Sequence, residues 1–198
     1  MAVTAIHQAE GVPYFSRWVV AEAVGRPEAV DPADSAAEAA VLVAAGQVRA
    51  GSQMRTKEFL SKLEHDRVVS AIREAESKTS GQIRVFIQRG KLNVDPLIAA
   101  QKKFHRLGMQ KTRERNAVLV FVAPRAHKFA VVGDTAIHEK CGEEFWQRVV
   151  EAMRAHFQKE KFNHAIVEAI EEIGKLLATH FPKRSASSNE LPDEIAEA

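Results

Sequence analysis

The chain has 198 residues, of which 45% are hydrophobic and 27% charged, a size and composition that suit one ordinary soluble domain with tails. Its single cysteine, Cys141, excludes an intrachain disulfide and fits a reducing compartment, so we expect a cytoplasmic protein. No segment reaches ~18 consecutive apolar residues, and Met1–Gln8 has no basic start followed by an apolar stretch, so we expect neither a membrane span nor a secretory signal.

The net charge of +2 is unevenly distributed along the chain. Residues 1–53 carry −3 and residues 185–198 carry −4, which leaves +9 on residues 54–184. A basic domain between acidic ends attracts anions such as phosphate groups, nucleic acid or an acidic partner.

Both ends of the chain differ in character from the middle. Val30–Ala50 is Ala-rich and has few bulky apolar residues, so 1–53 is predicted to be a loosely ordered extension, and Met54 is an alternative start. Tyr14–Val20 forms an apolar patch suited to docking either on the domain itself or on a protein partner. The polar tail 185–198 is predicted to be disordered.

The first predicted helix and strand follow Met54. Ser61 and Glu64 have the spacing of a capping box, which predicts a helix from there to about Thr79. Gly81 stands where a helix stop often lies, and Gln82–Gln88 alternates apolar and polar residues as a strand does.

A second helix is predicted to open at Asp95 or Pro96. Asn116–Ala123 is almost continuously apolar, which indicates a strand covered on both faces. A turn at Pro124–Ala126 leads to a further strand, His127–Gly133, so these two strands should form a hairpin.

Two more helices complete the domain, one carrying Phe145 to Phe157 and one capped by Asn163 and ended by Pro182. The order α-β-α-β-β-α-α with a buried central strand predicts an α/β domain over residues 54–184: a small three-layer α/β/α sandwich with a mixed sheet. A fourth strand is expected within Gly90–Val94.

Four segments in this order resemble the TPM domain family: Glu76–Val85 (ESKTSGQIRV), Asn116–Val122 (NAVLVFV), Lys128–Asp134 (KFAVVGD) with Ile137–Glu139, and Phe162–Ile170 (FNHAIVEAI). The family includes thylakoid-lumen and photosystem II-repair proteins described as acid phosphatase-like, and the likeness is to its short bacterial members. The resemblance covers about Phe59 to Pro182 and implies a Rossmann-like α/β/α sandwich. It also implies metal binding or weak phosphatase activity, but it implies a fold more strongly than a reaction.

Two residues depart from the family's pattern. Gln82 stands where many relatives carry Glu, which removes one potential metal-binding carboxylate. Thr135 replaces the second glycine of a Gly-x-Gly turn, which disfavours a tight anion-binding loop.

The candidate site is the mouth above the strand ends, where ligands gather in open α/β sheets. Asp134, with Thr79 and Asn116, offers oxygen ligands for a divalent cation such as Ca²⁺ or Mg²⁺, and that ion would hold a phosphate. The alternative is that Asp134 only caps the helix that follows it. Asn116 begins a strand and Asp134 ends one, so antiparallel pairing is needed to bring them together.

Lys128, Arg84 and His138 are the candidate contacts to an anion, and His138 is also a candidate general acid or phosphate nucleophile. The group from His138 to Glu143, which includes Cys141, has no zinc-motif spacing, and a surface turn explains it as well.

The sequence does not establish that the chain is an enzyme. It has no dinucleotide, P-loop or serine-hydrolase motif, and neither the Asp pair nor the Cys loop of two phosphatase classes. A basic stretch from Lys102 to Arg115 has one aromatic residue, Phe104, which helical periodicity buries, so nucleic-acid binding is disfavoured against a solvated helix face. The competing function is a non-catalytic protein-interaction module in repair or envelope maintenance.

Overall fold

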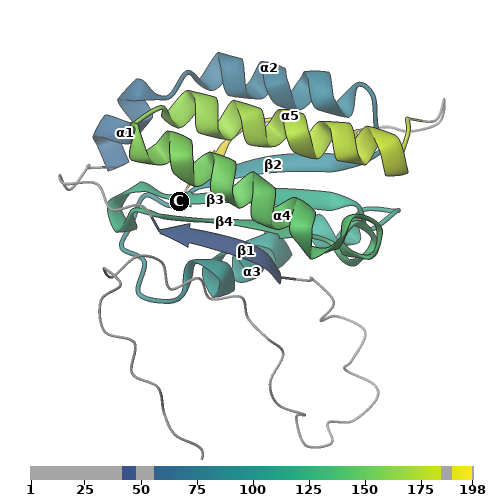
Figure 1. The fold of residues 1–198 in the computed structure, drawn as a ribbon, viewed down its shortest axis with the longest axis horizontal. Coiled ribbons are helices and arrows are strands. Elements are labelled where there is room, and N and C mark those ends of the chain that lie inside the picture. The colour runs from purple at the N-terminus through teal and green to yellow at the C-terminus, as the bar shows by residue number, and fades with distance from the viewer. Residues whose placement is uncertain (1–41, 48–55, 184–188, 198) are drawn as a thin grey trace, which may run out of the picture.

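The computed structural model describes residues 42–47, 56–183 and 189–197 (Figure 1). The helices and strands in chain order are β1 (Leu42–Gln47), α1 (Thr56–Lys62), α2 (His65–Glu76), β2 (Gln82–Ile87), α3 (Pro96–Arg106), the short 3-10 helix η2 (Met109–Lys111), β3 (Ala117–Ala123), η3 (Pro124–Ala126), β4 (Lys128–Gly133), α4 (Thr135–Gln158), α5 (Phe162–His180) and β5 (Ala196–Glu197).

The strands form one mixed sheet in the order β1-β4-β3-β2-β5. β2 runs parallel to β3 and to β5, whereas β4 is antiparallel to both β3 and β1. The pairing of β3 with β4 confirms the predicted hairpin, whose turn is η3.

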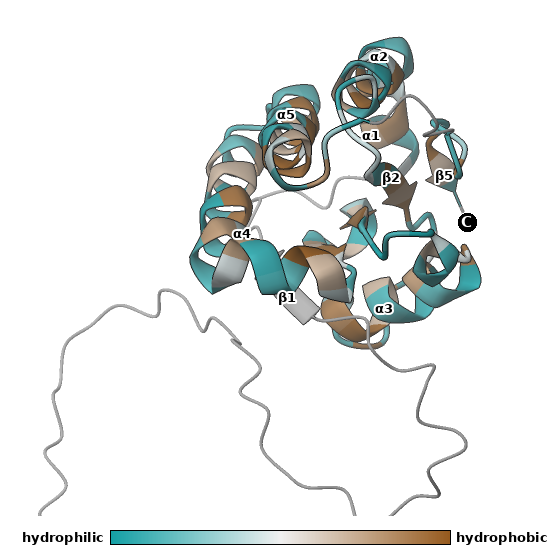
Figure 2. Ribbon diagram, turned by 90° about the vertical axis from the view of Figure 1, so that its right-hand side faces the viewer, coloured by the Kyte–Doolittle hydropathy of each residue, from teal (hydrophilic) through white to brown (hydrophobic). Residues whose placement is uncertain are grey.

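The central strand β3 has all seven of its residues buried, because helices cover both faces of the sheet. Alternate β3 side chains, such as Val120 and Phe121, enter two separate hydrophobic cores. One core lies under α1, α2, α4 and α5, and the other lies under α3 (Figure 2). The three-layer α/β/α sandwich with a mixed sheet is therefore confirmed.

The starts of α3 and α5 agree with the sequence, whereas α1 was not predicted as a separate helix, α4 begins earlier than expected and two predicted caps are wrong. Asp95 caps α3 by accepting a hydrogen bond from Leu97 N at 2.8 Å, as predicted. The capping box at Ser61 is wrong: Ser61 lies inside α1 and donates to the Glu58 carbonyl, and α2 begins after Glu64.

Asn163 is the second wrong cap, since it lies one residue inside α5. Its side chain instead accepts from Glu64 N at 2.8 Å and donates to the Lys62 carbonyl at 2.9 Å. It therefore satisfies the backbone break between α1 and α2, a tertiary contact that local spacing does not predict.

The predicted strand within Gly90–Val94 is wrong, because this segment is an irregular loop before α3. The two strands that were not predicted, β1 and β5, lie outside the predicted domain of residues 54–184. β1 falls in the part of the chain predicted to be a loosely ordered extension, and it pairs with β4 over Leu42–Gln47. The patch at Tyr14–Val20 and the alternative start at Met54 lie outside the described residues.

The tail, predicted to be disordered over 185–198, also differs, since residues 189–197 lie along the outer edge of β2. Backbone N–H groups of Glu190 and Leu191 donate to Gln82 Oε1 at 3.0 and 2.9 Å. β5 then pairs with β2 beside Phe86 and Ile87. The polar composition misled the prediction because the tail is held by hydrogen bonds to one buried amide and a sheet edge, and by a few apolar residues, Leu191, Ile195 and Ala196, that pack against the cores.

Helices α2 and α5 approach closely where Gly174 faces Ala75. A Cβ atom added at Gly174 would lie 2.6 Å from the Ala75 Cβ and 3.3 Å from its Cα. These are a rigid methyl group and backbone, so the helices would have to separate.

We expect Gly174→Ala to destabilise the protein by about 1–3 kcal/mol through overpacking, despite the better helix propensity of alanine. Gly90→Ala is the matched control, since the added Cβ there meets only the flexible end of the Gln88 side chain at 3.4 Å. Urea unfolding of both variants measures the difference; equal stability of the two would show that α2 and α5 do not pack at this distance.

Candidate functional site

The antiparallel hairpin brings the start of β3 and the end of β4 to the same end of the sheet. Val118 pairs with Gly133, and Asp134 N donates to the Ala117 carbonyl at 2.9 Å. Asn116 and Asp134 are therefore on adjacent strand ends, and both side chains have no exposed surface. The sequence analysis required antiparallel pairing to bring these two residues together, and β3 and β4 pair in this way.

Asp134 is both a helix cap and half of an ion pair. Its Oδ1 accepts a hydrogen bond from Thr135 N at 2.8 Å. Asp134 therefore caps α4, as the alternative interpretation of this residue predicted. Arg115 Nε lies 3.0 Å from each of the two carboxylate oxygens. Only Oδ1 is aligned for a hydrogen bond, so Oδ2 accepts none from the described residues.

Asn116 belongs to a short buried polar chain. Its Nδ2 donates to Ser80 Oγ at 3.1 Å and to Glu114 Oε2 at 3.4 Å, and Ser80 Oγ donates to the same Glu114 oxygen at 2.7 Å. A carboxylate only accepts, which fixes the amide with Oδ1 turned away from Glu114. Asn116 Oδ1 is buried and has no donor among the described residues.

Thr79, the third predicted cation ligand, makes other contacts. Its Oγ1 donates to the Phe181 carbonyl at 2.5 Å and accepts from Gly81 N at 3.0 Å. These bonds tie the turn before β2 to the end of α5. The neighbouring Ser80, rather than Thr79, reaches Asn116.

The three candidate anion contacts are separated. His138 lies in the first turn of α4, where its backbone N–H donates to the Asp134 carbonyl at 3.3 Å. Arg84 is buried within β2, and burial lowers the pKa of its guanidinium, although Glu194 and Glu76 partly offset this. Lys128 begins β4 and so lies at the opposite end of that strand from Asp134.

Cys141 is held within its own helix and is protonated in the absence of a metal. Its Sγ donates to the Ile137 carbonyl at 2.9 Å, and burial raises the pKa of the thiol to about 11, so the thiolate that a metal needs is disfavoured at neutral pH. The helix bends just after it at Gly142, whose φ is 66°.

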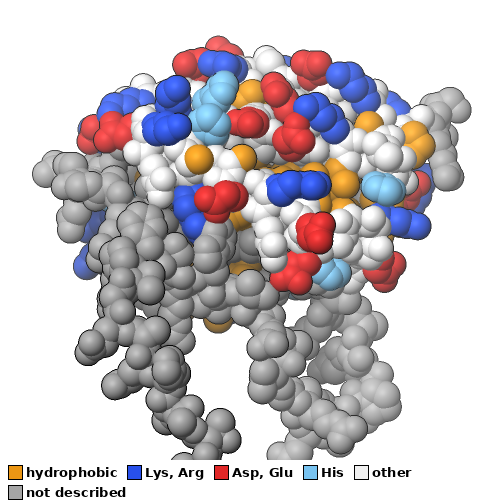
Figure 3. All heavy atoms as spheres, viewed as in Figure 1, with side chains coloured by type: hydrophobic (Ala, Val, Ile, Leu, Met, Phe, Trp, Pro, Cys, Tyr) orange, Lys and Arg blue, Asp and Glu red, His pale blue; other side chains and the backbone are white. Residues whose placement is uncertain are grey.

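The basic stretch is partly engaged within the protein. Arg115 pairs with Asp134, and Lys103 Nζ lies 4.1 Å from the centre of the Phe86 ring. At least two cations of this stretch are therefore occupied by contacts within the protein. Figure 3 shows a different face of the molecule, over α2, α4 and α5, where charged side chains of both signs are interspersed.

A hollow of about 160 Å³ lies beside the turn before β2, between the end of α2 and the tail. Its lining is mainly polar and charged: Arg73, Glu76, Ser77, Thr79, Gln82, Lys183, Asn189 and Asp193. Burial raises the pKa of Glu76 to about 8, and the nearby Asp193 adds to the shift, while the Ile83 N–H bond opposes it. That bond is 2.7 Å long.

Sequence reasoning missed Glu76, Glu114 and the tail acid Asp193. Glu76 ends a helix in a stretch that the sequence makes look exposed, but in the structure it is buried, bonds the N–H of Ile83 and lies near the tail residue Asp193. The sequence singled out Arg115 only as part of a basic stretch. Its position directly before Asn116, together with the predicted hairpin, would have placed it near Asp134.

The chain matches the sequence profile of the TPM domain over residues 54–176. Its structure resembles the NMR structure of BA42 protein from the psychrophilic bacterium Bizionia argentinensis, with 33% identity, a TM-score of 0.64, and coverage of 69% of this chain and 96% of that chain. The N-terminal domain of cg2496 protein from Corynebacterium glutamicum shares the fold at 15% identity and a TM-score of 0.50, covering 73% of this chain and 95% of that one. No curated protein matches. No helix in the described ranges is long and apolar enough to cross a membrane.

We expect Glu76 to make stability fall as pH rises. Its pKa in the folded protein is raised from 4.5 to about 8, so its contribution is full below pH 4.5 and is lost progressively up to about pH 8. The slope from this one group is at most about 1.4 kcal/mol per pH unit.

Glu76→Gln keeps an acceptor for Ile83 N and removes the charge. Urea unfolding between pH 5 and 8 should show a flatter profile for this variant and higher stability than the wild type at pH 8. Glu74→Gln, at an exposed position of the same helix, should keep the wild-type slope. Parallel wild-type and Glu76→Gln profiles would contradict the raised pKa.

Proposed function

Because the chain belongs to the TPM domain family, we propose that its domain binds a divalent cation, Ca²⁺ or Mg²⁺, at the Asp134 end of the sheet, with at most weak phosphatase activity. The observation that carries the proposal is a pair of buried oxygen acceptors, Asp134 Oδ2 and Asn116 Oδ1, that receive no hydrogen bond from the described residues. Buried acceptors are rarely left unpaired, and a bound ion is one of the explanations for such atoms.

The donor set suits a hard cation. Asp134 offers a carboxylate, Asn116 an amide oxygen and Thr135 a hydroxyl that already lies 3.2 Å from Asp134 Oδ1. Oxygen ligands of this kind select Ca²⁺ or Mg²⁺ over transition metals, and water completes the coordination.

Arg115 competes with a cation for the same carboxylate. Two like unit charges ~4 Å apart repel by ~4 kcal/mol at an effective dielectric constant of 20, and the double charge of Ca²⁺ or Mg²⁺ raises this to ~8 kcal/mol. The Arg115 side chain is 35% exposed, so solvent weakens this repulsion and lets the guanidinium swing away. Once displaced, it would be placed to pair with a phosphate oxygen held by the ion.

Any phosphatase activity would depend on the ion. Because Asp134 is held as a cap, it is not free to attack phosphorus. A bound ion would polarise the phosphoryl group, water would attack phosphorus as the ester P–O bond breaks, and His138, one helical turn along, would protonate the leaving oxygen. Arg84 and Lys128 do not lie beside Asp134 and take no part in the proposed reaction. Without a dedicated nucleophile the reaction should be slow.

We expect Arg115→Gln to bind Ca²⁺ or Mg²⁺ about tenfold more tightly than the wild type, because it removes the competing charge. Asp134→Asn, which keeps an oxygen to cap α4, should abolish binding. Asp95→Asn is the matched control, since Asp95 caps α3 in the same way. NMR titration of the full chain measures all four proteins, with hydrolysis of p-nitrophenyl phosphate as the activity readout.

Absence of saturable shifts near Asp134 at millimolar metal, in the wild type and in Arg115→Gln alike, would contradict the cation site. It would leave Asp134 as a cap and ion-pair partner, and it would favour the alternative of a non-catalytic protein-interaction module.

A further inference from the structure

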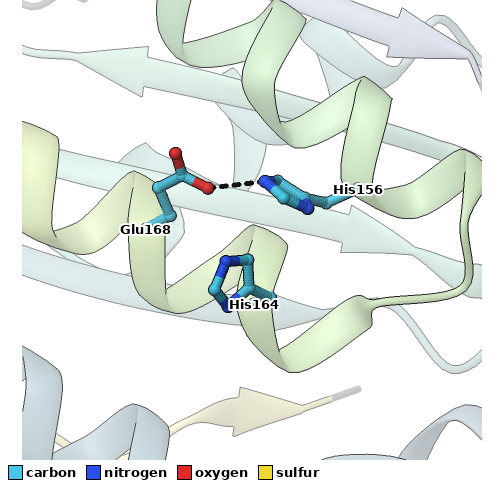
Figure 4. Close-up of side chains that lie close together, drawn as sticks. All are labelled: His156, His164 and Glu168. Carbon is cyan, nitrogen blue, oxygen red and sulfur yellow. Dashed lines mark ion pairs between the residues drawn. The ribbon is translucent and has the colours of Figure 1, made fainter.

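A second set of side chains with metal-binding chemistry lies between α4 and α5, away from Asp134. The ligand atoms of His156, His164 and Glu168 all lie within 4.8 Å of one another (Figure 4). Among the described residues this is the one group of three or more histidine, cysteine or acidic side chains that converge in this way. We propose that these three side chains form a zinc site.

The helices bring these ligands together from both sides of the α4–α5 turn. His164 and Glu168 are four residues apart on α5, so they lie on one face of that helix. His156 comes from the last turn of α4. A metal bound by all three would cross-link the two helices directly beside the turn that joins them.

The chemistry of the ligands selects the metal. Two imidazoles and one carboxylate suit Zn²⁺, whereas Ca²⁺ and Mg²⁺ prefer oxygen ligands alone. Three protein ligands leave the fourth tetrahedral position to water, as in zinc sites that polarise a water molecule or bind an anion. His164 is exposed, so both the ion and its fourth ligand have access from solvent.

Only modest side-chain movement would be needed. His156 Nε2 now lies 2.6 Å from Glu168 Oε2, and the two imidazole rings are 4.6 Å apart at 74°. Ligand atoms around a tetrahedral zinc are about 3.4 Å apart, so the ion would widen the first contact and shorten the longest one. The carboxylate and the exposed imidazole can rotate without moving the helices.

This site is independent of the proposed cation site. It shares no residue with the Asp134 end, and His156 lies 14 residues beyond the bend at Gly142, about 20 Å along the helix. The His156–Glu168 contact would also form as an ion pair if the histidine were protonated. Stoichiometric metal binding is therefore the property that distinguishes a zinc site from an ion pair.

The test is a Zn²⁺ titration of the full chain against a competing fluorescent chelator at neutral pH. One Zn²⁺ per chain should bind, and His164→Ala or Glu168→Gln should each weaken it at least about tenfold, since even the loss of a supporting group around a metal costs that much. His180→Ala, which removes an exposed histidine at the end of the same helix, should change affinity less than twofold. Asp134→Asn should also bind normally, which separates this test from that of the cation site.

Substituting Co²⁺ for Zn²⁺ gives a second readout. The bound ion should show the visible bands of a four-coordinate site without a thiolate charge-transfer band, because Cys141 is not a ligand. Zinc binding that is unchanged in His164→Ala and Glu168→Gln, or the absence of saturable binding up to roughly 100 µM free Zn²⁺, would overturn the proposal.

Discussion

The burial of β3 on both faces is the constraint from which the rest of the structure follows. A strand with seven buried residues needs apolar cover above and below, so the helices must divide between the two sides of the sheet. The short turn η3 then returns the chain antiparallel as β4. That reversal places Asn116 and Asp134, which lie 18 positions apart, at one end of the sheet.

Two buried carboxyl groups at this end are accommodated in different ways. Asp134 has a guanidinium and a backbone N–H beside it, both of which stabilise a charge. Glu76 has one backbone N–H and a second acid, Asp193, so burial prevails and its pKa rises to about 8. Asp134 is thus held by an ion pair and a capping bond, whereas Glu76 is buried beside a second acid, which favours its protonated form.

The sequence predicted the helices and strands that are determined by patterns among neighbouring residues. Continuous apolar residues identified β3, alternation identified β2, and Asp95 before Pro96 identified the start of α3, because each pattern reflects the surroundings of neighbouring residues. It also picked out Asp134 and Asn116, since polar residues at the ends of buried strands are conspicuous. Thr79 was misplaced by one residue, because the turn directs Ser80 rather than Thr79 toward Asn116.

What sequence reasoning missed depends on contacts between distant segments. Asn163 was taken for a helix cap because its partners, Lys62 and Glu64, are about 100 positions away. The converging histidines were missed for the same reason: the spacing of His164 and Glu168 is visible on one helix, but the approach of His156 depends on how α4 packs on α5.

The tail along β2 has a further consequence for how the protein behaves toward other copies of itself. A strand at the border of a sheet presents free N–H and C=O groups that another chain can pair with. Here Glu76 takes the N–H of Ile83, and β5 pairs at Phe86 and Ile87, so the border of β2 is occupied near both of its ends. Charged residues flank this cover, including Glu197, which pairs with Arg89. The acidic tail therefore covers a border of the sheet whose backbone groups another chain could otherwise pair with, and it does so with few residues and a high density of negative charge.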